Sequence, residues 1–247
     1  MPLRRMFSRK WFFTTLLVFA GTLILLRLGI WQLDRLEARR ADNAHYVEML
    51  SVPPLDLNNE SPQSVTAMEY RKVIVSGVYD FENQIAVRNQ YHDGQPGYHL
   101  FTPLQTGGLA VLVNRGWIPA DRNSSSEDWR KYDEPGEVKV TGEIRLGEGK
   151  PAFGGVADAL PADGSRLKIW NNADVARIAE QMPYPILRIY IQPETDPNDV
   201  APPIPSASEL ELTEGSHFGY ALQWFTFAAI LFIGYPFFLR KQDVGTK

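Results

Sequence analysis

Residues 11–33 read WFFTTLLVFAGTLILLRLGIWQL, and residues 220–239 read YALQWFTFAAILFIGYPFFL. At 1.5 Å of rise per residue, helices of these lengths span about 35 and 30 Å, enough to cross the hydrocarbon core of a bilayer. The two segments predict a membrane protein in which two transmembrane helices flank one extramembrane domain.

The charges beside these segments predict the orientation. Four basic residues and no acidic one precede the first segment, whereas residues 240–247 hold three basic side chains and one acidic. Basic residues are retained on the cytoplasmic side, so both tails, 1–10 and 240–247, are expected in the cytoplasm. Residues 4–7 (RRMF) resemble a twin-arginine export signal, but the apolar stretch is too long and lacks a cleavage site. We therefore expect a multi-pass protein of a bacterial inner membrane whose main domain is periplasmic.

The segment between the apolar stretches is acidic. Residues 34–216 contain 17 basic and 28 acidic side chains, a net charge of −11 against −4 for the whole chain. This balance argues against binding to nucleic acid and is compatible with soluble or basic protein partners. The chain has no cysteine, which excludes disulfides, thiolate metal sites and a cysteine nucleophile.

The pattern of residues 34–192 predicts one β-rich domain. Residues 34–50 are expected to extend the first helix, and a helix is expected over 173–182 with Asn172 as its N-cap. Six segments are expected to form strands: 70–79, 84–90, 98–105, 110–119, 137–146 and 184–192. Gly107-Gly108 is typical of a hairpin turn. The expected fold class of this domain is α+β, with a mainly antiparallel or barrel-like sheet. After the domain we expect a proline-rich tether over 193–216 and a second membrane helix over 217–239, which starts at the membrane interface.

His217 is the first candidate for chemistry. At helical spacing it shares a face with Tyr220 and Trp224 at the membrane surface. An imidazole beside aromatic rings there could ligate a haem iron. The alternative is an interfacial histidine in an aromatic belt with no ligand.

Arg27 is the second candidate, because a charge seven residues inside Asp34 is costly in lipid. It could bind an anion, such as a haem propionate or a carboxylate of a client membrane protein, or reach lipid phosphate. Trp31 lies four residues further along. Gln32 and Gln223, each near the outer end of its helix, could hydrogen-bond across the pair or mark the interface.

Asn114, Arg115 and Trp117 (in VLVNRGWIP) form the third candidate. A guanidinium beside a large aromatic anchor could bind a protein partner. The alternative is a strand-to-turn transition packed for stability. The sequence contains no GxSxG, HExxH, phosphate-loop or dinucleotide motif, so an enzyme is not expected.

Several segments in order along the chain carry a family resemblance. These are LGIWQL (28–33) with Arg35, Tyr70-Arg71, Gly97-Tyr98 with TPL (102–104), LVNRGWIP (112–119), and His217 with Tyr220-Ala221 and QWF (223–225). With these segments the chain resembles the Surfeit locus protein family, assembly factors of cytochrome c oxidase.

The resemblance implies a function in respiratory-chain biogenesis. It implies a non-enzymatic assembly factor or chaperone that binds haem a transiently and assists its insertion into the catalytic subunit of a haem-copper oxidase. His217 would be the axial ligand of the haem iron, and Trp224 would line the site; Arg27 as a propionate partner is our own inference. Haem A synthase is a second candidate partner, and membrane lipid a third. A scaffold that binds the oxidase subunit without haem is the alternative.

Overall fold

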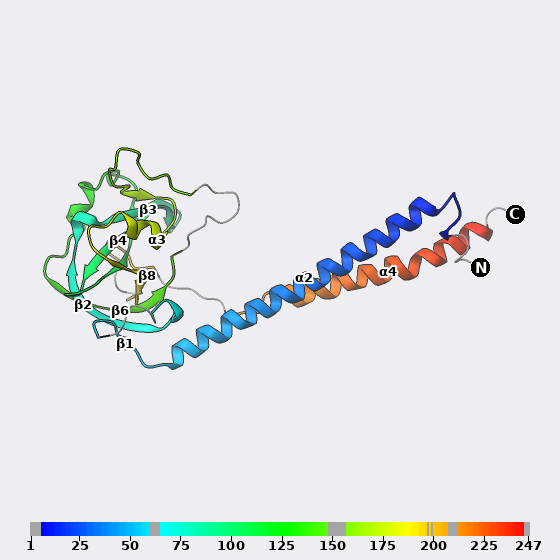
Figure 1. Cartoon of the computed structure of the whole chain (residues 1–247), viewed down its shortest axis with the longest axis horizontal. Helices are drawn as coiled ribbons and strands as arrows, with labels where there is room; N and C mark the ends of the chain where they lie inside the picture. The colour runs from blue at the N-terminus through cyan, green and yellow to red at the C-terminus, as the bar shows by residue number, and fades with distance from the viewer. Residues whose placement is uncertain are drawn as a thin grey trace. The chain divides into compact units, whose positions relative to one another are not determined.

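The computed structural model describes residues 6–59, 65–147, 157–196, 198, 200–206 and 212–244. The chain divides into two compact units, Met1–His45 with Glu211–Lys247 and Tyr46–Leu210. The first is helical and the second is rich in β-strands (Figure 1).

Two long helices dominate the helical unit. Helix α2 (Phe12–Ser51) continues without a break through the charged stretch 34–50, as predicted, and α4 comprises His217–Val244. Both are long and apolar enough to cross a membrane, by length and composition. Large apolar side chains are exposed on them, among them Phe13 (78%) and Phe232 (61%). Soluble proteins rarely expose extended apolar surface, so this exposure agrees with a lipid environment.

The second unit is built on an eight-stranded sheet with the order β1-β2-β6-β8-β5-β4-β3-β7. The strands are β1 (Leu55–Asp56), β2 (Lys72–Tyr79), β3 (Ile85–His92), β4 (Gln95–Gln105), β5 (Ala110–Pro119), β6 (Glu137–Arg145), β7 (Ile169–Trp170) and β8 (Ile186–Pro193). All six predicted strand segments are confirmed. The two-residue strands β1 and β7 were not predicted.

One pairing closes the sheet. Strand β2 pairs with β6 along its length and with β4 at its end, where Val78 and Tyr79 oppose Gln105 and Leu104. Strands β2, β6, β8, β5 and β4 thereby form a closed five-stranded barrel. The sequence had left open whether the domain closes.

Alternation along the strands fills the barrel. Val73 and Val75 on β2 are fully buried, while Ile74 between them and Ser76 after them are partly exposed. They belong to one apolar cluster with residues of every barrel strand, including Leu104, Val111, Val113, Val140, Ile144, Ile189 and Ile191. Burial of each such side chain stabilises the folded state by roughly 1.5–3 kcal/mol. This apolar core stabilises the domain without disulfides.

A short helix covers a second apolar cluster. Helix α3 (Val175–Glu180) buries Val175 and Ile178 against strands of the sheet, as its spacing predicts. The predicted N-cap was wrong: Asp174, not Asn172, accepts the hydrogen bond from the backbone N–H of Arg177. Asn172 instead donates its backbone N–H to the carboxylate of Asp158 and is thereby part of the loop that precedes α3.

Part of the predicted tether is docked on the barrel. Backbone hydrogen bonds join Trp117 and Ile204 in both directions, at 2.7 and 2.8 Å. A Cβ atom at Gly116, where φ is +120°, would lie 2.3 Å from the carbonyl oxygen of Ile204. Glycine therefore permits this close approach, and Ile204–Ser206 belong structurally to the domain.

Candidate functional site

Helices α2 and α4 pack antiparallel within the helical unit. Buried residues recur every seven positions on each helix: Thr22, Gly29 and Leu36 on α2, and Ala221, Ala228 and Tyr235 on α4. This period is typical of left-handed helix pairs. The ring of Phe225 lies directly over Gly29, and near the other end the hydroxyls of Thr15 and Tyr235 are 2.7 Å apart.

His217 is bound to α2 at the opposite end of this pair. Its Nδ1 atom lies 2.8 Å from the Oε1 atom of Gln32, so of the two alternatives that the sequence left open, Gln32 makes a hydrogen bond across the helices. A carbonyl oxygen only accepts, so Nδ1 carries the ring proton. In the neutral imidazole with this tautomer, Nε2 is the nitrogen that has a lone pair for a metal.

Tyr220 and Trp224 follow His217 on the same side of α4. Three and seven residues on, they lie within about 60° of His217 around the helix axis. Tyr220 is 49% exposed, and the ring of Trp224 stands edge-on to that of Phe227. The structure thus brings together the three α4 residues that the sequence singled out, on a surface that is partly open.

Arg27 and Trp31, four residues apart, lie on one face of α2. The guanidinium of Arg27 lies 3.7 Å from the carboxylate of Asp34, and both side chains are more than 60% exposed. Around α2, Arg27 is about 140° from Gln32, so it does not face the histidine. Trp31 is next to Gln32 and 46% exposed.

Further along α2, three side chains hold the segment that leads into α4. Arg39 and Asn43 donate to the carbonyl oxygen of Thr213, at 3.2 and 3.4 Å. Arg40 forms two parallel hydrogen bonds with the carboxylate of Glu214, at 2.7 and 2.8 Å. These contacts place the start of α4 against α2, three residues before His217. The sequence analysis missed them, because nothing local pairs residues 39–43 with 213–214.

Arg115 lies inside the β-rich domain. Its side chain is 3% exposed and pairs with the carboxylate of Glu134, which is 62% exposed. It also donates to the carbonyl oxygen of Tyr132 and packs over the rings of Tyr79 and Phe81. Burial raises the pKa of the Tyr79 phenol to about 12, so this ring stays neutral beside the guanidinium.

Asn114 and Trp117 are also buried, at 3% and 4% exposed. Asn114 donates to Gln192 at 2.8 Å and lies 3.4 Å from Nδ1 of His99. His99 and Gln192 in turn contact Ser206, at 3.0 and 2.8 Å. With Arg115, these contacts favour the structural interpretation of the Asn114–Trp117 segment over the partner-binding one. No sequence signal links these four polar residues, which come from three strands and the docked segment.

Burial sets the ionisation of His99. It lowers the pKa of the imidazole to about 4, with a smaller contribution from the nearby His92. The ring is therefore neutral at neutral pH. It borders a polar cavity of about 320 Å³, together with Asn114 and Gln192.

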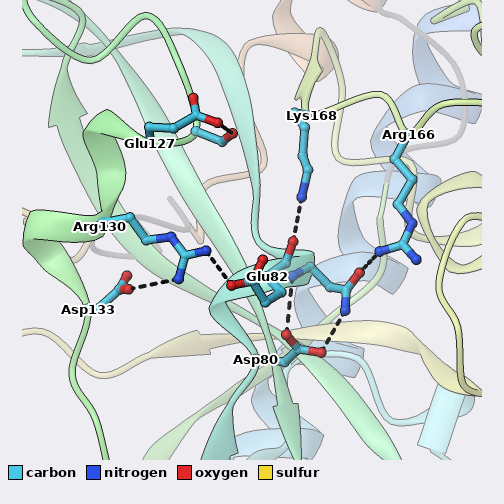
Figure 2. Close-up of polar contacts among 9 residues, drawn as sticks. Asp80, Glu82, Glu127, Arg130, Asp133, Arg166 and Lys168 are labelled. Carbon is cyan, nitrogen blue, oxygen red and sulfur yellow. Dashed lines mark hydrogen bonds and ion pairs between the residues drawn. The ribbon is translucent and has the colours of Figure 1, made fainter.

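A further polar cluster surrounds the turn Phe81–Asn83 (Figure 2). Asp80 accepts hydrogen bonds from the backbone and side-chain amides of the last residue of this turn, at 3.2 and 2.7 Å. Glu82 pairs with Arg130, and its carbonyl oxygen accepts from Lys168 at 2.5 Å. These contacts join distant segments and serve the fold. Among the residues that the structure describes, no group of three or more His, Cys, Asp or Glu could hold a metal ion.

Comparison with known proteins identifies relatives over most of the chain. A family model described as "SURF1 family" matches residues 19–229. A SURF1-like protein of Rickettsia bellii is 27% identical over 234 residues, which cover 92% of this chain and 91% of that protein. Surfeit locus protein 1 of Arabidopsis thaliana is 25% identical, covering 92% and 77%. The cytochrome oxidase assembly protein SHY1 of Saccharomyces cerevisiae is 34% identical over 109 residues, covering 43% and 28%.

Proposed function

The chain belongs to the SURF1 family, and on that premise we propose that it is a membrane-anchored assembly factor for a haem-copper terminal oxidase. The yeast relative SHY1 is a cytochrome oxidase assembly protein by name. The proposed action is to bind haem a and assist its insertion into the catalytic subunit of the oxidase. No catalytic step is part of this proposal.

The hydrogen bond between His217 and Gln32 carries the proposal for haem. It holds the imidazole by Nδ1 and leaves Nε2 as a free ligand atom. Tyr220 and Trp224 supply aromatic surface beside it, and the exposed Trp31 precedes Gln32 on α2. These residues fit a haem: a nitrogen ligand for iron, rings for the macrocycle, and apolar helices below.

A single axial ligand suits a carrier. His217 would be the single protein ligand of the iron, so a residue of the receiving subunit could displace it without first breaking a second protein contact to the metal. The site is partly exposed rather than enclosed, as the 49% exposure of Tyr220 indicates. Transfer therefore requires no opening of a buried pocket.

The proposed location is the bacterial inner membrane, with both termini in the cytoplasm and the barrel in the periplasm. The basic residues outside the two helices support this orientation. The acidic segment 34–216 would then lie where the oxidase presents its outer surface. The catalytic subunit is the proposed client, and haem A synthase a proposed source of the haem.

The test is to produce the full-length protein together with the haem A synthesis enzymes and to purify it in detergent. The wild type should carry haem with a histidine-ligated spectrum, and His217→Ala should lose it while the domain stays folded. His45→Ala, on α2 but about 20 Å along the helix from Gln32, should retain haem. Absence of haem from the folded wild type would contradict the haem site and support a haem-free scaffold that binds the oxidase subunit.

A further inference from the structure

We propose that Arg35 binds a propionate carboxylate of the haem and thereby orients the macrocycle at the membrane surface. The proposal rests on the proposed haem site at His217 and adds to it a second contact. It also replaces the earlier expectation that Arg27 has this role.

Arg35 lies where a carboxylate of such a haem would be. It follows Gln32 by three residues, so it lies about 60° from Gln32 around α2 and about 4.5 Å further from the membrane centre. Residues spaced i and i+3 are neighbours on a helix surface. Gln32 holds His217, so Arg35 stands one turn above the ligand on the aqueous side.

The remaining arginines of α2 are engaged. Arg27 pairs with Asp34, Arg39 donates to the carbonyl oxygen of Thr213, and Arg40 pairs with Glu214. For Arg35, which is exposed, no hydrogen bond or ion pair to a described residue is found. Its guanidinium is therefore available to an anion.

Arg35 is also on the correct side of the helix pair. Viewed from the outer end, both helices turn clockwise as they descend, because both are right-handed. Gly29 on α2 and Ala221 on α4 are buried and mark the direction in which each helix faces its partner. Measured from Gly29, the Cα–Cβ direction of Arg35 is rotated clockwise around α2. Measured from Ala221, that of Trp224 is rotated anticlockwise around α4. Because the two helices face each other, a clockwise rotation on one and an anticlockwise rotation on the other bring both side chains to the same side of the pair. Arg35 therefore shares a surface with the proposed haem residues.

The chemistry of haem matches this arrangement. Its two propionates leave one edge of the macrocycle, while the opposite edge is apolar. An apolar edge directed into the membrane brings the carboxylates toward water, where Arg35 lies. A guanidinium binds a carboxylate through two parallel hydrogen bonds, and such a contact fixes rotation about the bond between iron and histidine.

The test compares haem a with its dimethyl ester, in which the carboxylate charges are removed. Both are titrated by absorbance into detergent-purified full-length protein, as wild type, Arg35→Gln and Arg27→Gln. The wild type should bind the free acid about tenfold more tightly than the ester, which corresponds to about 1.4 kcal/mol. Arg35→Gln should remove this preference by weakening the free acid alone, and Arg27→Gln should retain it. The exposed position and the good helix propensity of glutamine keep the variant folded.

Other outcomes overturn the inference in distinguishable ways. Equal affinity of Arg35→Gln and wild type for the free acid would exclude a propionate contact. Equal weakening of both haem forms in Arg35→Gln would also exclude a propionate contact, because the ester has no carboxylate charge to lose. A wild type that binds neither form in a His217-dependent manner would instead refute the proposed function itself.

Discussion

The Nδ1 atom of His217 lies 2.8 Å from the Oε1 atom of Gln32, which joins the first residue of α4 to α2. The contact spans 185 positions of sequence. It determines which nitrogen of the imidazole carries the proton and which way the ring points. The packing of α2 and α4 thus holds the imidazole ring at the first residue of α4.

Gln32→Leu should weaken haem binding about 10- to 100-fold, since loss of the group that orients a metal-binding histidine has effects of this size. The measurement is a haem titration followed by absorbance. Gln223→Leu, an exposed position of α4, is the control and should bind as the wild type does. Unchanged affinity of Gln32→Leu would show that the hydrogen bond does not orient the ligand.

Gly29→Leu should destabilise the helix pair by about 1–3 kcal/mol, because the position has no room for a side chain. A Cβ atom there would lie 2.5 Å from the ring of Phe225. Gly234→Leu is the matched control, since nothing lies within 4 Å of a Cβ atom at that position. Thermal unfolding in detergent should separate the two variants, and equal melting temperatures would contradict this packing.

Arg115→Met should destabilise the β-rich domain by roughly 3 kcal/mol. The substitution removes a buried guanidinium and leaves the carbonyl oxygen of Tyr132 without this donor. Arg188→Met, at an exposed position of β8, should change stability little. Urea unfolding of the full-length protein is the measurement. If Arg115→Met instead unfolds like the wild type and loses only binding of the oxidase subunit, the partner-binding interpretation of this segment is correct.

The stability of the β-rich domain should fall as the pH is lowered from about 6.5 to 4. The pKa of His99 is about 4 in the folded protein, against 6.5 for an ordinary histidine. The unfolded chain therefore binds the proton first. The contribution of neutral His99 is complete above pH 6.5 and is lost over this interval, a change on the order of 3 kcal/mol.

His99→Gln should reduce this pH dependence, whereas His45→Gln should retain it. Urea midpoints at several pH values between 4 and 7 provide the measurement. A slope that is identical in wild type and His99→Gln would assign the effect to other groups, such as the carboxylates.

Local patterns predicted a large part of this structure. The six strands follow from the alternation of apolar and polar residues, as in Val73 and Val75, and the two long helices follow from uninterrupted apolar runs. Hydropathy and alternation are properties of short contiguous segments, so they can be recognised in the sequence without knowledge of the tertiary structure. The N-cap of α3 was the local error, because Asn172 and Asp174 are both good caps and the preceding loop engages Asn172.

The candidate site was predictable in its residues but not in its contacts. His217, Tyr220 and Trp224 share a face through helical spacing alone. That Gln32 meets His217, and that Arg35 thereby comes near the histidine, depends on which face of α2 packs against α4. Likewise, Arg115 and Trp117 have the composition of a binding surface, and only their burial shows that they support the barrel.

The sequence by itself therefore determined the two membrane-length helices, the strands between them, and the residue types of the candidate site, since each depends on short-range periodicity and composition. The tertiary structure alone decided that β2 meets β4 to close a barrel and that Gln32 holds His217. Those outcomes depend on pairs of residues far apart in the chain, whose contact is set by the packing of whole elements.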